Sequence, residues 1–170
     1  MSVSVRSAAA LMTWRQPFAR ALCSVDTSPV MGKGFPVETI PADQFDTVLI
    51  FATGSGVSPI RAVIESGALE AGKRRDVRLY YGARSMRHLA FQDRFELWRE
   101  QGVSVVPVLS QGEPGWAGKR GYVQDAFALE DGSLADPSRT AVLLCGQKAM
   151  AEAVKERLGA KGVTQFLTNF

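Results

Sequence analysis

The sequence has few residues of the kinds that build metal centres, disulfide frameworks or membrane spans. Its 170 residues include two cysteines, Cys23 and Cys145, and one histidine, His88. Two cysteines are too few for a disulfide framework and have no zinc-ligand spacing, so no metal site is expected. No run of about 18 apolar residues occurs, which excludes a transmembrane helix. No serine or cysteine is placed in the sequence to form a catalytic triad with His88.

The composition is that of an ordinary globular chain. Hydrophobic residues make up 46% of the sequence and charged residues 22%. At about 150 residues per domain, this length predicts one domain with a short appendage. The formal net charge of +3 suits phosphate-bearing ligands or acidic partners. A bias this small does not indicate binding to nucleic acid.

The first 46 residues differ from the rest of the chain. Residues 1–25 contain no aspartate or glutamate, and Arg6, Arg15 and Arg20 lie among serine, alanine and apolar residues. This composition is typical of an organelle transit peptide, and the alternative is an amphipathic helix that packs on the body. Residues 26–41 are rich in proline and glycine and predict irregular chain. We therefore expect a short irregular N-terminal segment over residues 1–46.

From Thr47 onward, apolar β-branched runs alternate with helical patterns. Strands are expected over residues 47–52, 77–82, 103–110, 140–146 and 163–167, and helices over 59–71, 88–101, 122–129 and 149–158. Repeated βα units predict a doubly wound, Rossmann-like α/β fold, with a five-stranded parallel sheet and helices on both faces. Pro107 predicts an edge position or a bulge. Ligands bind such sheets beyond the carboxyl ends of the strands.

The loop after the first expected strand carries the strongest chemical signal. Residues 53–59 read TGSGVSP, in which glycines allow a close approach to a phosphate. Ser58 is suited to cap the following helix, and Pro59 to its first position. The free N–H groups of that helix would favour an anion. The loop is neither the GxGxxG fingerprint nor a P-loop, and a tight turn without a ligand is the alternative.

Four motifs occur in a characteristic order: ATGSGVSP at residues 52–59, YGAR at 81–84, GYVQD at 121–125 and CGQKAM at 145–150. As a set they resemble the NAD(P)-binding domain of the ferredoxin–NADP reductase superfamily. VMGKGF at residues 30–35 and the C-terminal LTNF resemble the plant and algal plastid "fruit protein" type of FAD/NAD(P)-binding oxidoreductases. The resemblance covers residues 47–170, which we assign to an NAD(P)-binding reductase domain.

The resemblance implies a role for individual residues at the nucleotide site. In the loop after the first strand, Thr53, Gly54 and Gly56 would lie against the pyrophosphate and nicotinamide. Ser55 and Pro59 of the same loop are also expected to bind the cofactor, with Ser55 beside the path of the hydride. Cys145 and Gly146 would lie near the nicotinamide ring, although a buried cysteine at the end of a strand has the same pattern. Tyr122 would stack on adenine.

The resemblance also implies which groups choose the nucleotide and shape the hydride path. Ser110 and Arg120 would face the adenosine 2′-phosphate, and the basic residues Arg84, Arg87 and Lys119 are compatible with that group. These residues favour NADP, whereas Pro114, Trp116 and Gly121 resemble the NADH-using cytochrome b5 reductase branch and leave NAD as the alternative. Gln111 departs from the family pattern, because chloroplast members have arginine there. Thr53, Cys145 and the C-terminal Phe170 would shape the path of the hydride, with Phe170 covering a flavin ring or filling the core.

A full reductase of this family has a flavin domain of roughly a hundred residues before the nucleotide domain. Only 46 residues precede the first expected strand, so FAD would need a missing or partner domain. The expected function is an NAD(P)H-binding module of a flavin-dependent oxidoreductase that passes hydride from NAD(P)H to FAD. The alternative is a non-catalytic nucleotide-binding or structural subunit of a larger complex.

The expected ligand is a pyridine dinucleotide, and the expected protein partner is a flavin-bearing or redox protein. The resemblance and the N-terminal composition predict location in a plastid, with the mitochondrion or the cytoplasm as alternatives.

Overall fold

The computed structural model describes residues 34–129 and 134–169, which belong to one compact unit. The transit-like residues and Phe170 lie outside the described residues. Within the described ranges, no helix is long and apolar enough to cross a membrane. The same ranges contain no group of three or more histidine, cysteine, aspartate or glutamate side chains that could hold a metal ion.

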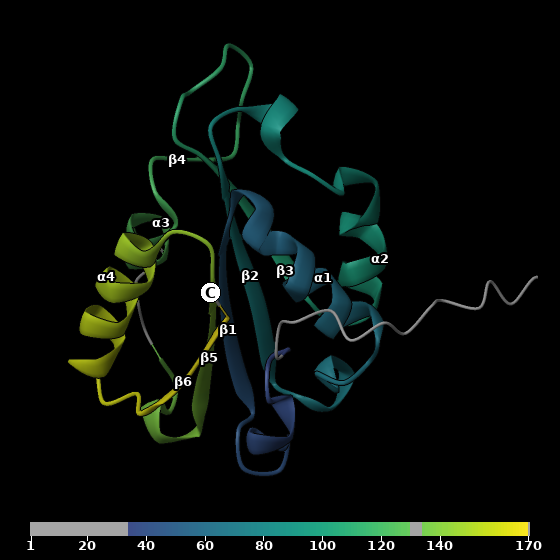
Figure 1. The fold of residues 1–170 in the computed structure, drawn as a ribbon, viewed down its shortest axis with the longest axis vertical. Coiled ribbons are helices and arrows are strands. Elements are labelled where there is room, and N and C mark those ends of the chain that lie inside the picture. Colours follow the sequence, from purple (N-terminus) through teal and green to yellow (C-terminus); the bar gives the residue numbers. More distant parts are fainter. Residues whose placement is uncertain (1–33, 130–133, 170) are drawn as a thin grey trace, which may run out of the picture. The chain divides into compact units, whose positions relative to one another are not determined.

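Six parallel strands form one sheet in the order β4-β3-β2-β1-β5-β6 (Figure 1). Their bounds are β1 Thr47–Thr53, β2 Asp76–Ala83, β3 Ser104–Leu109, β4 Lys119–Arg120, β5 Thr140–Cys145 and β6 Gln165–Asn169. The parallel α/β architecture is as expected, but the expected number of five strands is wrong. The additional strand, β4, has two residues, which is too short to show an alternating or apolar pattern in the sequence.

The two strands at the centre of the sheet are apolar throughout. All six residues of β5 are buried, as are the first six residues of β1. Such continuous burial is typical of parallel strands that are covered on both faces. By contrast, β3 pairs with β2 along its length and with β4 only at Val108 and Leu109. Pro107 therefore has a paired strand on one side only, where its missing N–H is tolerated.

Helices cover both faces of the sheet (Figure 1). The helices α1 (Val57–Glu65) and α2 (Phe95–Glu100) bury Ile60, Val63 and Trp98 in one apolar cluster. The helices α3 (Val123–Leu129) and α4 (Lys148–Gly159) contribute to a second cluster on the opposite face. This two-layered covering is the doubly wound arrangement that alternating βα units predict.

Two helices are shorter than the sequence predicts. The helix expected over residues 59–71 ends at Glu65, and Gly67 follows with a φ of 73°. The helix expected over residues 88–101 is instead two 3₁₀ turns, Met86–His88 and Gln92–Arg94, followed by α2. Phe91 separates them with a φ of 58°, a left-handed conformation that interrupts a right-handed helix. The last strand begins two residues later than expected.

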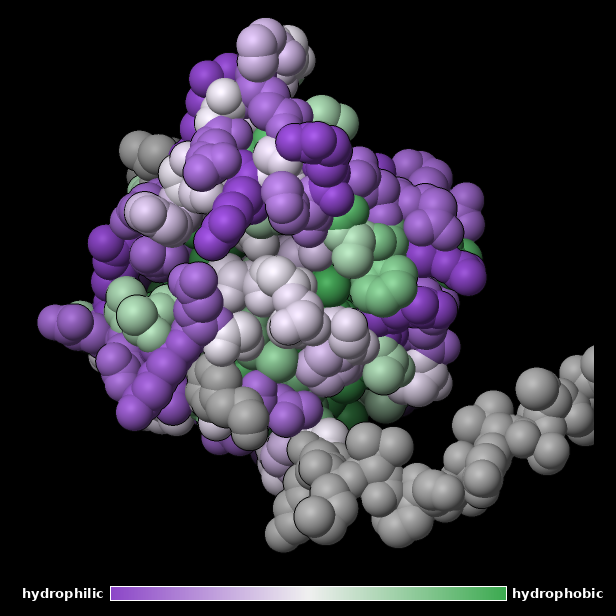
Figure 2. Space-filling view, turned by 45° about the horizontal axis from the view of Figure 1, so that its top comes forward, coloured by the Kyte–Doolittle hydropathy of each residue, from purple (hydrophilic) through white to green (hydrophobic). Residues whose placement is uncertain are grey.

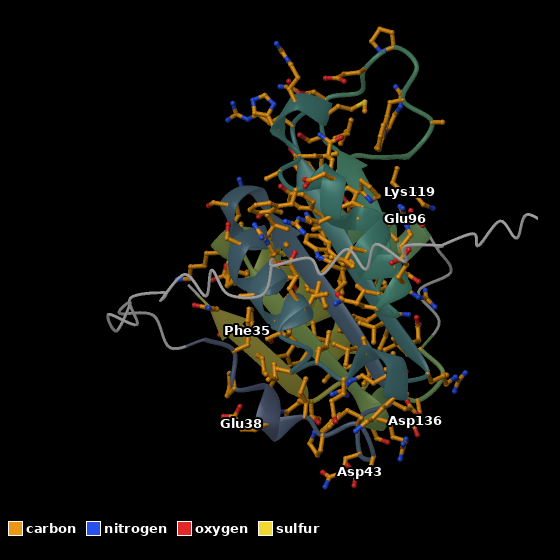
Figure 3. All side chains as sticks on the ribbon, turned by 90° about the vertical axis from the view of Figure 1, so that its right-hand side faces the viewer. Phe35, Glu38, Asp43, Glu96, Lys119 and Asp136 are labelled. Carbon is orange, nitrogen blue, oxygen red and sulfur yellow. The ribbon has the colours of Figure 1, made fainter. Side chains whose placement is uncertain are left out.

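Residues 34–46, here called the N-terminal strap, pack on the sheet as part of the same compact unit. Phe35 and Ile40 of the strap are buried in the cluster that contains α1 and α2. Figure 3 labels Phe35, Glu38 and Asp43 along the strap, with Asp43 near Asp136 at the end of the molecule away from Lys119. The strap therefore reaches the amino end of β1 along the body of the domain.

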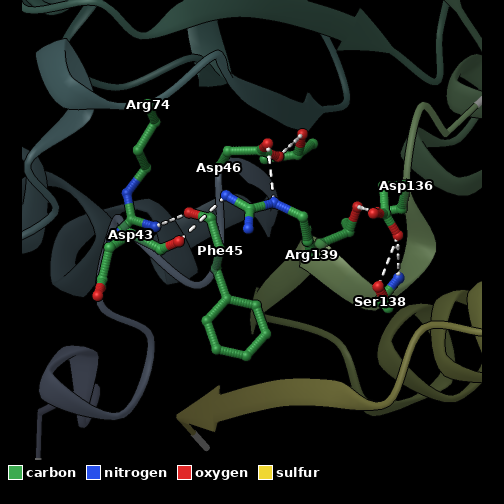
Figure 4. Close-up of polar contacts among 9 residues, drawn as sticks. Asp43, Phe45, Asp46, Arg74, Asp136, Ser138 and Arg139 are labelled. Carbon is green, nitrogen blue, oxygen red and sulfur yellow. Dashed lines mark hydrogen bonds and ion pairs between the residues drawn. The ribbon is translucent and has the colours of Figure 1, made fainter.

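Two arginines fix the N-terminal strap (Figure 4). The guanidinium of Arg74 donates hydrogen bonds to the carbonyl oxygens of Leu69, Ile40 and Phe45. Arg139 donates to a carboxylate oxygen of Asp46 at 3.1 Å. Burial lowers the pKa of the Arg74 guanidinium, although an arginine remains charged at neutral pH. Arg74 thus supplies the hydrogen bonds that these buried carbonyls would otherwise lack.

Candidate functional site

A cavity of about 760 Å³ opens beyond the carboxyl ends of β1, β2 and β3. Its size falls within the range of roughly 300–1,000 Å³ that small-molecule sites in proteins occupy. The walls come from the β1–α1 loop, the segment after β2, the residues before α3 and the start of α4. Figure 2 looks onto this end of the molecule, where pale and green surface lies between hydrophilic rims. The cavity is therefore where a doubly wound sheet binds its ligand.

The residues that line the cavity include no aspartate or glutamate among the described ranges. Two of the lining side chains, Arg84 and His88, can carry positive charge. Gly54 also begins the 3₁₀ turn Gly54–Gly56 that runs into α1, and the leading N–H groups of such a turn favour a negative charge. An anion bound here would meet attractive groups without a competing carboxylate. The electrostatics of the described walls thus favour a phosphate-bearing ligand.

The structure brings together some of the residues that the sequence predicts for the site. The predicted residues that line the cavity are Thr53, Gly54, Ser55, Arg84, Ser110 and Tyr122. The side chain of Tyr122 is well placed to offer a flat surface, because the residue is 60% exposed. Their placement follows from the fold, since each lies just after a strand or before α3. Their contacts with a nucleotide stay predictions.

Other predicted residues do not line this cavity: Gly56, Pro59, Arg120, Cys145 and Gly146. Pro59 is the third residue of α1 rather than its first, and Ser58 makes no capping hydrogen bond. A proline is tolerated in this first turn because the leading N–H groups of a helix have no partner within it. The predicted contact of these residues with a nucleotide stays a prediction.

The two loops that follow β1 and β5 pack against each other at backbone distance. A Cβ atom on Gly56 would lie 2.5 Å from the carbonyl oxygen of Cys145. A Cβ atom on Gly146 would lie 2.2 Å from Oγ1 of Thr53. That same oxygen accepts a hydrogen bond from the Gln147 N–H at 3.0 Å. These two glycines are required by the packing of the loops, a reason that the motif alone does not reveal.

Gly54 has a different environment from Gly56. Its φ is 55°, and a Cβ atom there would meet nothing within 4 Å. Gly54 lies on the cavity wall, whereas Gly56 is buried behind it. At Gly54, glycine allows the left-handed backbone and leaves the cavity open. At Gly56, glycine allows the two loops to pack closely.

Some lining residues were missed by the sequence analysis. Tyr81, Gln147 and Met150 line the cavity and belong to motifs already noted, YGAR and CGQKAM, so the motifs could have indicated them. Phe91 also lines the cavity, and no sequence signal marks it. It reaches the wall because its left-handed backbone turns the chain between two 3₁₀ turns. His88 also lines the cavity. Its Nδ1 lies 2.8 Å from Oγ of Ser85, and no sequence pattern predicted this contact.

Arg120 holds the loop between β3 and β4. Its Nη2 donates to the carbonyl oxygens of Glu113 at 3.4 Å and Trp116 at 3.3 Å. Trp116 in turn donates from Nε1 to the carbonyl oxygen of Lys119 at 2.9 Å. Arg84, in contrast, is exposed on the cavity wall, and its guanidinium has no recorded hydrogen bond or ion pair to another described residue. Of these two predicted arginines, Arg84 is the one whose guanidinium is available to a ligand in the cavity.

Cys145 is buried at the end of β5, with 7% of its surface exposed. Its Sγ donates a hydrogen bond to the carbonyl oxygen of Asn169 in β6, at 3.0 Å. Burial raises the pKa of the thiol, so the protonated form predominates at neutral pH. A protonated, enclosed thiol does not act as a nucleophile. The expected position of Cys145 beside a nicotinamide ring stays a prediction.

The family follows from this fold and its site. The doubly wound sheet and its cavity beyond β1–β3, with no carboxylate among the described lining residues, are typical of nucleotide-binding domains of the α/β class. The family described as "Oxidoreductase NAD-binding domain" matches residues 50–156, and the chain belongs to that family. The resemblance to the NAD(P)-binding domain of ferredoxin–NADP reductases and to the fruit-protein type is confirmed.

Two relatives and one solved structure illustrate the relationship. Fruit protein pKIWI502 of Actinidia deliciosa is 44% identical over 154 residues, which cover 86% of this chain and 48% of the relative. Ferredoxin–NADP reductase B of Sorangium cellulosum is 32% identical over 114 residues, which cover 64% of this chain and 46% of the relative. The fold is similar to a crystal structure of a ferredoxin NADP⁺ reductase from Neisseria gonorrhoeae with bound FAD and NADP. That match has a TM-score of 0.64 at 20% identity and covers 77% of this chain and 57% of the other.

The chain spans about half the length of these two relatives.

The two glycines of the β1–α1 loop provide a matched test of the site geometry. We expect Gly56→Ala to lower the free energy of unfolding by about 2–3 kcal/mol, because the new Cβ would overlap the backbone of Cys145. Gly54→Asn should change stability by no more than about 1 kcal/mol, since asparagine tolerates the left-handed backbone. Urea unfolding measures both. Equal destabilisation by the two substitutions would contradict this assignment of roles.

The buried thiol predicts a pH dependence of stability at alkaline pH. An unfolded cysteine has a pKa of about 8.5, and burial raises the pKa of Cys145 in the folded state. The folded protein then keeps this proton to higher pH than the unfolded chain does. Stability from this group is complete below about pH 8.5 and is lost as the pH rises through the folded-state pKa. Urea unfolding at several alkaline pH values should give a smaller slope for Cys145→Ala than for the unchanged protein. An unchanged slope in Cys145→Ala would refute the prediction.

Proposed function

We propose that the chain is the NAD(P)H-binding module of a flavin-dependent oxidoreductase and passes hydride from NAD(P)H to FAD. The observation that carries this proposal is the carboxylate-free cavity at the carboxyl ends of β1–β3, in a domain of the oxidoreductase NAD-binding family. The alternative of a non-catalytic subunit is less favoured. Relatives with matching residues include one named as a ferredoxin–NADP reductase.

The walls of the cavity suit the parts of a pyridine dinucleotide in a definite order. The turn that begins at Gly54 suits the pyrophosphate, because the leading N–H groups of a 3₁₀ turn that runs into a helix have no partner within it. Tyr122 follows β4, which lies across β3 and β2 from β1 in the sheet, and it offers its exposed ring to adenine. Gln147 and Met150, at the start of α4 after β5, form the wall toward the nicotinamide. The chain thus binds and orients the dinucleotide across the switch point between β1 and β5.

Bound FAD would supply the group that accepts hydride. Two smaller cavities among the described residues, of about 190 and 330 Å³, do not adjoin the residues assigned to the nucleotide. One of these cavities lies at Thr47 and Asp76, the starting residues of β1 and β2, which is the opposite end of the sheet. A flavin that received hydride would therefore be held by a segment or partner that adjoins the large cavity.

Arg84 and Ser110 favour NADPH over NADH. The Ser110 N–H donates to the carbonyl oxygen of Ala83, and the Gln111 N–H donates to that of Arg84, both at 2.9 Å. These bonds place the residues after β2 and β3 side by side at the cavity. An exposed guanidinium next to a hydroxyl suits a phosphate on the adenosine ribose. No carboxylate among the described lining residues is placed to bind a ribose hydroxyl, as an NAD site would require.

The preference for NADPH can be tested by calorimetric titration of the purified chain. We expect Arg84→Ala to weaken NADPH binding about tenfold, the effect of losing one charge-assisted hydrogen bond. NADH affinity should change little, since NADH lacks the 2′-phosphate. Lys161→Ala, which removes an exposed positive charge after α4, controls for net charge. Equal losses for the two nucleotides would remove Arg84 from the 2′-phosphate site.

Hydride delivery can be tested by absorbance spectroscopy. The purified chain is mixed with FAD, desalted, and then given NADPH without oxygen. Because FAD would need a further domain, nucleotide binding without retained flavin is the expected result for the chain alone, and retained flavin that NADPH bleaches would show hydride transfer within this chain. Retained flavin without bleaching would contradict hydride transfer. Nucleotide binding without retained flavin would assign the flavin to a partner chain, and a pull-down with flavin detection would then identify the complex.

We further propose that the protein is located in a plastid. The acid-free composition of residues 1–25 and the similarity to the fruit protein of a plant support this location.

A further inference from the structure

His88 is held in a defined orientation at the wall of the large cavity. Its Nδ1 lies 2.8 Å from Oγ of Ser85, and its backbone N–H donates to the carbonyl oxygen of Ser85 at 3.0 Å. Ser85 is buried, with 7% of its surface exposed. These two contacts within one 3₁₀ turn fix both the backbone and the ring of His88.

The contact with Ser85 determines which ring nitrogen faces a ligand. Among the described residues, the buried hydroxyl of Ser85 has a hydrogen bond with Nδ1 of His88 and with no other side chain or backbone group. The contact is compatible with either ring tautomer, and the proposal below uses the one in which Nδ1 accepts the hydrogen of the buried hydroxyl. In the neutral ring, Nε2 then carries the hydrogen. His88 therefore has one hydrogen-bond donor left, and this donor is on the ring nitrogen that Ser85 does not occupy.

The wall that carries His88 is itself anchored by three side chains. The hydroxyl oxygen of Tyr81 accepts a hydrogen bond from the Ala90 N–H at 2.9 Å. Nε2 of Gln92 donates to the carbonyl oxygens of Met86 and Leu89. The guanidinium of Arg61 lies 4.6 Å from the centre of the Phe91 ring, a cation–π contact. A donor on an anchored wall loses little conformational entropy on binding, which makes it useful for specificity.

The position of this wall along the sheet indicates the part of the ligand that it meets. Arg84 and His88 follow β2, one strand away from β1 and its pyrophosphate-binding turn. Adjacent strands lie about 4.8 Å apart, so the end of β2 is on the path from that turn toward Tyr122. The adenosine half of a dinucleotide whose adenine lies on Tyr122 follows this path. Its ribose would pass between the His88 wall and Ser110.

We infer that His88 donates a hydrogen bond from Nε2 to the 2′-phosphate of the adenosine ribose, beside Arg84, and thereby selects NADPH over NADH. The inference rests on the proposed function, since it requires a dinucleotide in the cavity. His88 is a specificity-determining residue in this role and takes no part in hydride transfer. Ser85 is the positioning residue, because it directs the hydrogen of the ring to Nε2.

The test measures binding of NADPH, NADH, 2′-AMP and 5′-AMP by calorimetry. We expect His88→Ala to weaken NADPH and 2′-AMP about tenfold and to leave NADH and 5′-AMP almost unchanged. His88→Gln should restore most of the affinity for 2′-AMP, because its amide nitrogen can donate from the end of a side chain of similar reach. Met86→Ala is the matched control, since Met86 is an exposed residue of the same 3₁₀ turn that does not line the cavity.

Each other outcome has a distinct meaning. Equal losses of NADPH and NADH in His88→Ala would overturn the inference and assign His88 to the pyrophosphate or to folding. Unchanged binding of all four ligands would also overturn it. Failure of the unmodified protein to bind either dinucleotide would overturn the proposed function itself, and the inference with it. Binding of both dinucleotides by the unmodified protein, with no selective effect at His88, would leave the proposed function standing alone.

Discussion

The close packing of the β1–α1 loop on the residues after β5 is the constraint on which the site depends. Gly56 lies against the backbone of Cys145, and Gly146 against Thr53. A side chain at either glycine would separate the two loops. Because β1 and β5 are neighbours whose chains leave toward opposite faces of the sheet, the ends of these strands open the cavity. The two glycines therefore fix the relative positions of the turn at Gly54 and the start of α4, which are opposite walls of one site.

Much of the fold was predictable from the sequence because its central strands carry strong patterns. The runs in β1 and β5 are apolar throughout, and such runs are typical of buried parallel strands. The two-residue β4 was not predictable, since it has no room for a pattern and exists through its pairing with Val108 and Leu109. The division of residues 88–101 was missed for another reason. Phe91 adopts a left-handed conformation, which only tertiary packing imposes on an aromatic residue.

In the candidate site, too, some residues can be found from local sequence motifs, whereas others depend on contacts between distant parts of the chain. Gly54, Arg84, Ser110 and Tyr122 were predictable because each follows a strand or precedes a helix in a recognisable motif. The pairing of Ser85 with His88 was not, because the expected continuous helix gave no indication of a separate turn there. Gly56, whose contact with a nucleotide stays a prediction, also has a packing role that only the fold reveals. Motifs thus located the loops, but the function of each residue within them depended on neighbours distant in the sequence.

The central claim is that the cavity beyond β1–β3 binds a pyridine dinucleotide. The most direct measurement is a titration of NADP⁺ into the isotopically labelled chain, followed by the NMR shifts of its backbone amides. The account predicts saturable shifts concentrated at Gly54, Ser110, Tyr122 and Gln147, on the four walls of the cavity. Absence of saturable shifts, or shifts confined to the opposite end of the sheet near Thr47 and Asp76, would contradict it.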